Sequence, residues 1–182
     1  MYIKLIFYFG KLPNDCIRQL LVLYSTIDLL LFWWCIITLM AETFKITREF
    51  RFEAAHLLDH HDGKCKNLHG HGYVLQVELM APLHVSGPKE GMIWDFTDLK
   101  SLVREKILEP FDHSFIYNTR SERESKIANL LISLDSKVTP LPFRTTAEAL
   151  AKYIFDILTQ AGAPISAIRL WESASSFCEY RR

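Results

Sequence analysis

The chain has 182 residues, of which 49% are hydrophobic, so it is long enough for one globular domain with a buried core. Its 21 basic residues balance 21 acidic residues, which argues against a nucleic-acid-binding protein because that class carries a basic surplus. The cysteines form no Cys-x-x-Cys pair and suggest no disulfide framework, so we expect a reducing compartment, the cytoplasm.

Residues 1–39 differ in composition from the rest of the chain. The run 19–41 is almost wholly apolar and has nearly the length of a membrane helix, with Asp28 as its only charge. An aspartate near the centre of such a helix costs about 2.5 to 3.5 kcal/mol on insertion scales. We expect translation to begin at Met40, which leaves residues 40–182 as the functional domain and residues 1–39 as a mis-assigned extension. A signal anchor or an added buried helix are the alternatives, and a membrane partner is expected only if residues 1–39 are real.

Alternating apolar residues predict the strands of the domain. The pattern runs from Phe44 to His56, interrupted only by Arg48, and then from Tyr73 to Leu79. A polar loop over residues 57–66 separates these two stretches. Two further strands are predicted over residues 167–173 and 176–181.

Two helices are predicted between the strand pairs. The first spans residues 95–109, with Asp95 as its cap and Pro110 after its end, and the second opens at the capping box 145–148. Residues 119–143 read as a long polar connection in which Ser121-x-x-Glu124 can begin a short helix. The order predicts an α+β fold, an antiparallel four-stranded sheet with two main helices on one face, whose open edges can pair between subunits.

Three histidines have the spacing of a metal site. His69 and His71 are two residues apart, so on a strand they share a face, roughly 6.6 Å apart along the chain. His56 ends the preceding strand, which an antiparallel pairing would bring beside them. Three imidazoles and an open position suit catalytic zinc; iron or three plain polar loop residues are the alternatives. His60 and His61 lie in the polar loop and are expected at the surface.

Several motifs together resemble the 6-pyruvoyltetrahydropterin synthase family. They are Phe-Glu-Ala-Ala-His at 52–56, Cys-x-x-x-His-Gly-His at 65–71, Gly-Met-Ile-Trp-Asp-Phe at 91–96, Phe-Asp-His at 111–113 and Thr-Ala-Glu at 146–148. The spacing from Cys65 to His69 is similar to that of the branch that makes 6-carboxytetrahydropterin for queuosine synthesis. At residues 144–146 and 171–173, this sequence differs from the residues that are usual in the family. The resemblance implies that these changes affect ring seating and the pocket rim.

The resemblance implies a fold, an assembly and a set of site residues. The fold would be the tunnelling fold, assembled as trimers and then as a homohexamer. Zinc would be held by His56, His69 and His71. The catalytic group would be Cys65, Asp112 and His113, the last two supplied by a neighbouring subunit. Substrate would be bound by Glu172, which anchors the pterin ring, and Thr146, which helps to seat it.

The implied activity is a zinc-dependent carbon–carbon lyase. It would convert 7,8-dihydroneopterin triphosphate to 6-carboxy-5,6,7,8-tetrahydropterin, acetaldehyde and triphosphate. Cys65, flanked by Lys64 and Lys66, would act as a thiolate base, and His113, oriented by Asp112, as the complementary acid or base. One alternative is the branch that makes 6-pyruvoyltetrahydropterin. The other is a non-catalytic zinc module that scaffolds an oligomer, for which Cys65 would be dispensable.

Overall fold

The computed structural model describes residues 42–182. The predicted extension over residues 1–39 and the predicted start at Met40 lie outside this range. Within the described part, no helix is both long and apolar enough to cross a bilayer.

An antiparallel hairpin of two long strands forms the centre of the sheet. β1 (Phe44–His56) pairs with β2 (His69–Ala81) along its full length, and β5 and β6 extend the sheet on the β2 side. The predicted pairs of strands at both ends of the domain are therefore confirmed. β5 spans Ile165–Ser173 and lies next to β2, and β6 spans Ser176–Arg181 and forms one edge of the sheet.

The predicted four-stranded antiparallel sheet is incomplete, because two short strands continue it beyond β1. The sheet is mixed and has six strands in the order β4-β3-β1-β2-β5-β6. β3 (Ser114–Asn118) lies parallel to β1, and β4 (Val138–Leu141) lies parallel to β3. Pro140 weakens the strand pattern of β4 in the sequence, and an edge strand is where a sheet tolerates proline.

The first predicted helix is present but longer and less regular than expected. Asp95 caps α2 (Phe96–Val103), and its carboxylate accepts a hydrogen bond from the Thr97 amide at 2.7 Å. A π-helical segment η2 (Arg104–Leu108) follows, and then a short α3 (Glu109–Phe111). Pro110 was wrongly expected to follow the helix. It lies in the first turn of α3, where a missing N–H group is tolerated.

Of the two later helices, α4 begins at its predicted cap, and the cap of α5 lies one residue after the predicted cap Thr145. Ser121 caps α4 (Glu122–Ser133), so the polar connection holds a full helix of 12 residues. Thr146 caps α5 (Ala147–Gln160) by accepting a hydrogen bond from Ala149. Thr145 therefore lies just outside the helix and is free to make other contacts.

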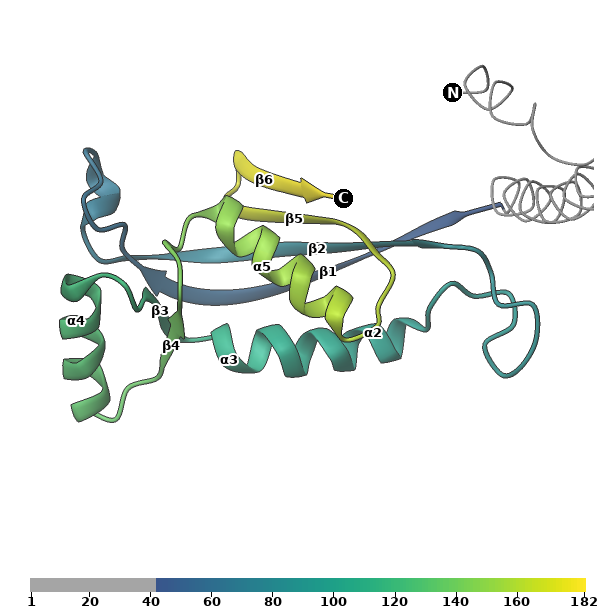
Figure 1. Cartoon of the computed structure of the whole chain (residues 1–182), viewed down its shortest axis with the longest axis horizontal. Coiled ribbons are helices and arrows are strands. Elements are labelled where there is room, and N and C mark those ends of the chain that lie inside the picture. Colours follow the sequence, from purple (N-terminus) through teal and green to yellow (C-terminus); the bar gives the residue numbers. More distant parts are fainter. Residues whose placement is uncertain (1–41) are drawn as a thin grey trace, which may run out of the picture. The chain divides into compact units, whose positions relative to one another are not determined.

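The helices divide the sheet into a buried face and a charged face. Figure 1 shows α5 and the α2–α3 segment over one face of the long strands, with α4 beside β3 and β4. The alternating residues of β1 and β2 fill the core, including Phe52, Tyr73 and Leu75. The other face carries ion pairs around Glu78. Because side chains alternate between the two faces of a strand, His56 lies on the helix-covered face together with the core residues Phe52 and Ala54.

Candidate active site

His56, His69 and His71 converge at one end of the central hairpin. The register pairs His56 with His69 and Ala54 with His71, so the three side chains share a face. Their ring centroids are 4.7 to 5.2 Å apart, and one nitrogen of each ring lies within 4.8 Å of the others. The hairpin register therefore brings together the three residues that their spacing predicted.

The buried His56 ring is oriented by the segment before α5. Its Nδ1 lies 2.8 Å from the carbonyl oxygen of Thr145, which can only accept, so Nδ1 carries the proton. Its Nε2 is buried and has no hydrogen-bond partner. Burial lowers the pKa of His56 to about 4, despite the opposing hydrogen bond to Thr145. The ring is therefore neutral at pH 7, with an unshared electron pair on Nε2.

His69 is oriented in the same way by its own loop. Its Nδ1 lies 2.8 Å from the carbonyl oxygen of Asn67, which leaves Nε2 as the free atom. Backbone carbonyls that fix the second nitrogen of a ligating histidine are characteristic of metal sites. Two rings oriented in this way and a third beside them fit a divalent ion such as zinc, with room for substrate in a fourth position.

Cys65 lies in the loop that joins His56 to His69. It is the middle residue of a short 3-10 turn, η1 (Lys64–Lys66), and its thiol is free and partly buried. The Cys65 carbonyl accepts a hydrogen bond from the Leu58 amide at 2.8 Å, which closes the loop. The loop that carries Cys65 thus begins and ends at two of the three histidines, but the thiol is not part of their cluster.

Asp112 and His113 form a pair on the turn between α3 and β3. Nδ1 of His113 lies 3.0 Å from a carboxylate oxygen of Asp112, and the same oxygen accepts a hydrogen bond from the Glu53 amide. That backbone hydrogen bond, followed by the adjacent His113, lowers the pKa of Asp112. The His113 side chain is 77% exposed, so its ring is available to a substrate or to another subunit.

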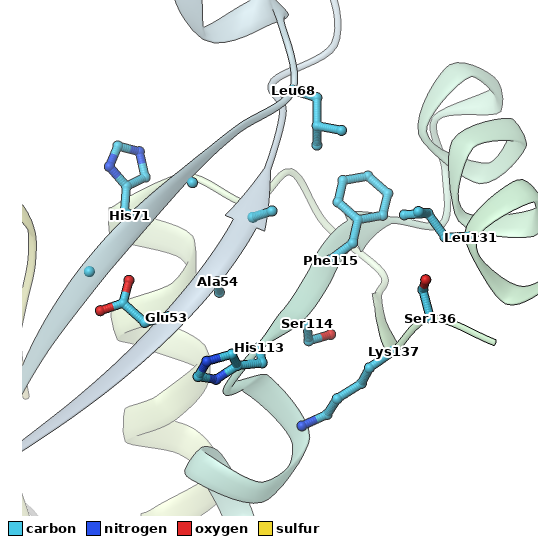
Figure 2. A pocket seen from close by; sticks show the side chains of 13 residues that line it. Glu53, Ala54, Leu68, His71, His113, Ser114, Phe115, Leu131, Ser136 and Lys137 are labelled. Atoms are coloured by element: carbon cyan, nitrogen blue, oxygen red, sulfur yellow. The ribbon is translucent and has the colours of Figure 1, made fainter. Parts of the chain in front are cut away.

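Within one chain, this pair and the histidine cluster lie on opposite faces of the hairpin. A Cβ atom added at Gly72 would lie 3.0 Å from the Glu53 carboxylate, so Gly72 and Glu53 share the face that His71 does not use. On that side a cavity of about 500 Å³ is lined by Glu53, Gly72, His113, Ser114 and Lys137, and it also borders His71. Figure 2 shows His113 and Lys137 at this cavity and the ring of His71 directed away from them.

Glu172 places an unpaired carboxylate on the same face as the histidines. It follows Ile168 and Leu170 on the core-facing side of β5, where the pairing with β6 is irregular. Its Oε1 is buried and has no hydrogen-bond partner, and burial raises its pKa. The neighbouring hydroxyl of Tyr73 is also buried, and its burial together with the nearby Glu172 carboxylate raises its pKa. Unpaired buried polar atoms are costly, so they indicate a ligand with polar groups.

Two residues of this region escaped the sequence analysis. Thr145 acts through a backbone carbonyl, which leaves no side-chain signature in the sequence. Tyr73 was assigned only to the core face of its strand, although its hydroxyl lies beside Glu172. Thr146 caps α5 next to Thr145, so it is close in sequence to a residue that contacts the cluster.

Comparison with known proteins gives consistent matches over the described domain. Residues 45–182 match the profile of the family described as 6-pyruvoyl tetrahydropterin synthase. A Haemophilus influenzae protein named 6-carboxy-5,6,7,8-tetrahydropterin synthase is 58% identical over 139 residues, which are 76% of this chain and 99% of that protein. A Synechocystis protein of the same name is 32% identical over 137 residues, 74% of this chain and 91% of its own length.

Solved structures agree on the fold at low sequence identity. An uncharacterized protein from Wolinella succinogenes superposes with a TM-score of 0.60 at 20% identity, covering 78% of this chain and 99% of that one. The 6-pyruvoyl tetrahydropterin synthase of Caenorhabditis elegans superposes with a TM-score of 0.56 at 23% identity, covering 78% and 96%. These similarities extend over almost the whole of each solved chain.

Proposed function

The chain belongs to the 6-pyruvoyl tetrahydropterin synthase family, and from that premise we propose that it is a 6-carboxy-5,6,7,8-tetrahydropterin synthase. The reaction would convert 7,8-dihydroneopterin triphosphate to 6-carboxy-5,6,7,8-tetrahydropterin, acetaldehyde and triphosphate, in the cytoplasm and for queuosine synthesis. The observation that carries this proposal is the cluster of His56, His69 and His71 beside an unpaired carboxylate, Glu172. The identity of 58% to a relative of that name supports the choice of branch.

His56, His69 and His71 would hold a zinc ion through their free ring nitrogens. The ion would supply a Lewis acid that lowers the pKa of the hydroxyl groups on the side chain of the substrate. The two carbonyl contacts of the cluster, from Thr145 and Asn67, keep the free nitrogens directed inward. Preorganised ligands of this kind reduce the reorganisation needed when the ion and the substrate bind.

Glu172 and Thr146 would orient the pterin ring. The unpaired Oε1 of Glu172 can accept hydrogen bonds from the amino-pyrimidine edge of the ring, which carries neighbouring N–H donors. Such a pair satisfies a carboxylate whose burial is otherwise unfavourable. Thr146, at the start of α5, would help to seat the ring.

Cys65 and His113 would transfer the protons. Cys65 would remove a proton from a carbon of the substrate side chain as a thiolate, and His113 would act as the complementary acid or base. Nδ1 of His113 lies 3.0 Å from the carboxylate of Asp112, so Nε2 would be the atom that faces the substrate. Exposure of the His113 ring suits a group that acts on another subunit's substrate.

We propose that the complete site forms between subunits of a homohexamer, a dimer of trimers. His71 borders the cavity that His113 lines, but its ring is directed away from His113 (Figure 2), so we infer that a second chain brings the two groups together. Within residues 42–182, β1 pairs with β3 only at Ala54 and Ala55. The edge from Phe44 to Phe52 is therefore available to a strand of another subunit, as closed oligomers require.

Incubation of the protein with 7,8-dihydroneopterin triphosphate tests the proposed activity. We expect acetaldehyde and triphosphate in equal amounts, and loss of both after removal of the metal by a chelator. Triphosphate without acetaldehyde would assign the chain to the pyruvoyl branch instead. A zinc-bound protein that releases neither product would fit the non-catalytic module and overturn the proposal.

A further inference from the structure

The backbone of the Asp112–His113 turn has an unfavourable conformation. His113 has a φ of 56°, in the left-handed region, which is unfavourable for a residue other than glycine. On one side, β1 holds the turn: the His113 amide donates to the carbonyl oxygen of Glu53 at 2.6 Å. Such a conformation persists only where the surrounding contacts impose it.

A second set of contacts holds the turn from the side of β4. Lys137 extends its ammonium group to the carbonyl oxygens of Glu109 and Asp112, at 2.5 and 2.7 Å. Thr139 donates its hydroxyl to the carbonyl oxygen of Pro110 at 2.6 Å. The end of a helix leaves carbonyl groups without partners, and a cation is favourable there. Three carbonyls of the α3 end are thus bound by two residues of one edge segment.

The geometry of β4 makes these contacts a rigid connection. Lys137 and Thr139 are two residues apart and therefore point to the same face of the extended segment. Phe115, two residues after His113, donates its amide to the Lys137 carbonyl at 3.1 Å. The hydroxyl of Ser114, directly after His113, lies 2.7 Å from that of Thr139. The strand that leaves the turn is consequently fixed to the same segment that binds the helix before it.

We propose that Lys137 is a positioning residue for His113, because its ammonium group, with Thr139, clamps the end of α3 and sets the direction of the imidazole. This inference rests on the proposed function. Figure 2 shows the Lys137 side chain reaching toward His113 along the cavity. Lys137, directly before β4, and Thr139, within β4, bind a turn that β1 holds on its other side.

A plain surface role for Lys137 does not account for these contacts. Among residues 42–182, Lys137 forms no ion pair with a carboxylate, and its donors go to two main-chain oxygens instead. The lysine also contributes positive charge near Asp112, whose pKa is lowered first by the Glu53 amide and then by its charged neighbours. An ionised Asp112 keeps its contact with Nδ1 of His113.

The test compares Lys137→Met, Lys137→Arg and the matched control Lys126→Met in the assembled, metal-loaded protein. Lys126 is an exposed lysine of α4 that pairs with Glu122. For Lys137→Met we expect kcat for acetaldehyde release to fall about 10- to 100-fold, because small misplacement of a catalytic group has that effect. KM, metal content and Tm should stay close to those of the wild type, whereas a merely structural defect would lower Tm. Lys137→Arg should restore most of kcat, and Lys126→Met should behave as the wild type.

Hydrogen exchange provides a readout that does not depend on the reaction. Without the lysine, amides over residues 109–116 should exchange faster, while those of β1 and β2 keep their protection. Unchanged exchange in this segment, or an unchanged kcat in a protein that releases acetaldehyde, would overturn the proposed role of Lys137. If the wild type releases no acetaldehyde, the proposed function fails, and the exchange result alone supports or overturns the clamp.

Discussion

The Nδ1 atom of His56 lies 2.8 Å from the carbonyl oxygen of Thr145, so the segment before α5 orients the last residue of β1. The two residues are 89 positions apart in the sequence. The contact commits Nδ1 as a donor and leaves Nε2, buried and without a partner, to bind a metal ion. The sheet and the helix layer thus meet at the candidate metal site.

Substitution of His56 by alanine should abolish metal binding. The ring is one of the three proposed ligands and is only 2% exposed, so neither water nor a neighbouring side chain replaces it easily. Metal analysis of protein without a polyhistidine tag should fall from about one ion per chain to background. His60→Ala is the matched control, because His60 is an exposed histidine of the same loop region and should keep its metal. Full metal content in His56→Ala would remove His56 from the site.

Substitution of Cys65 by alanine should separate chemistry from metal binding. Loss of the proposed base should lower kcat by about 10²- to 10⁴-fold, since that is the usual contribution of a general base. Metal content should not change, because the thiol is not part of the histidine cluster. Cys178→Ala, which removes the other free thiol of residues 42–182, should retain the wild-type rate. Normal turnover in Cys65→Ala would contradict the assignment of Cys65 as the catalytic base.

Substitution of Glu172 by glutamine should weaken binding of the pterin. Loss of hydrogen bonds to a charged acceptor costs roughly 1.5 to 3 kcal/mol, which corresponds to a fall in kcat/KM of about 10- to 100-fold. Steady-state kinetics with 7,8-dihydroneopterin triphosphate would measure this change. Glu105→Gln, at a position whose side chain is 66% exposed, is the control and should have little effect. Equal kinetics for Glu172→Gln and the wild type would contradict the anchoring role.

The sequence predicted the parts of the site that depend on local periodicity. His69 and His71 share a face because strands alternate, and His56 joins them because the hairpin register is set by the apolar pattern. Contacts made by backbone carbonyls, such as that of Thr145 to His56, leave no periodic pattern of residue types in the sequence. The strands β3 and β4 were missed because they are short, and β4 contains Pro140. The clamp by Lys137 depends on that missed strand, so it was not predictable either.

The acid stability of the fold should depend on Glu78, on the charged face of the sheet. Burial alone would raise the pKa of Glu78, but hydrogen bonds from Ser166, Arg169 and Lys45 outweigh it and lower the pKa from 4.5 to about 2. A carboxylate with a depressed pKa in the folded state stabilises above its unfolded pKa, and this contribution is lost as pH falls through the folded pKa. Stability should therefore decline between pH 4.5 and about 2. The loss should reach at most roughly 2 kcal/mol, because Lys45 and other partners are partly exposed.

Urea unfolding at several pH values and one protein concentration would measure this dependence. Glu78→Gln should be less stable than the wild type at pH 7, because its cationic partners lose their counter-charge. The difference between the two proteins should shrink as the pH falls below 4.5, where the Glu78 carboxylate of the unfolded wild-type chain begins to be protonated. Glu90→Gln, at an exposed position, should follow the wild type throughout. A gap between Glu78→Gln and the wild type that widens in acid would show that Glu78 does not stabilise the fold through its charge.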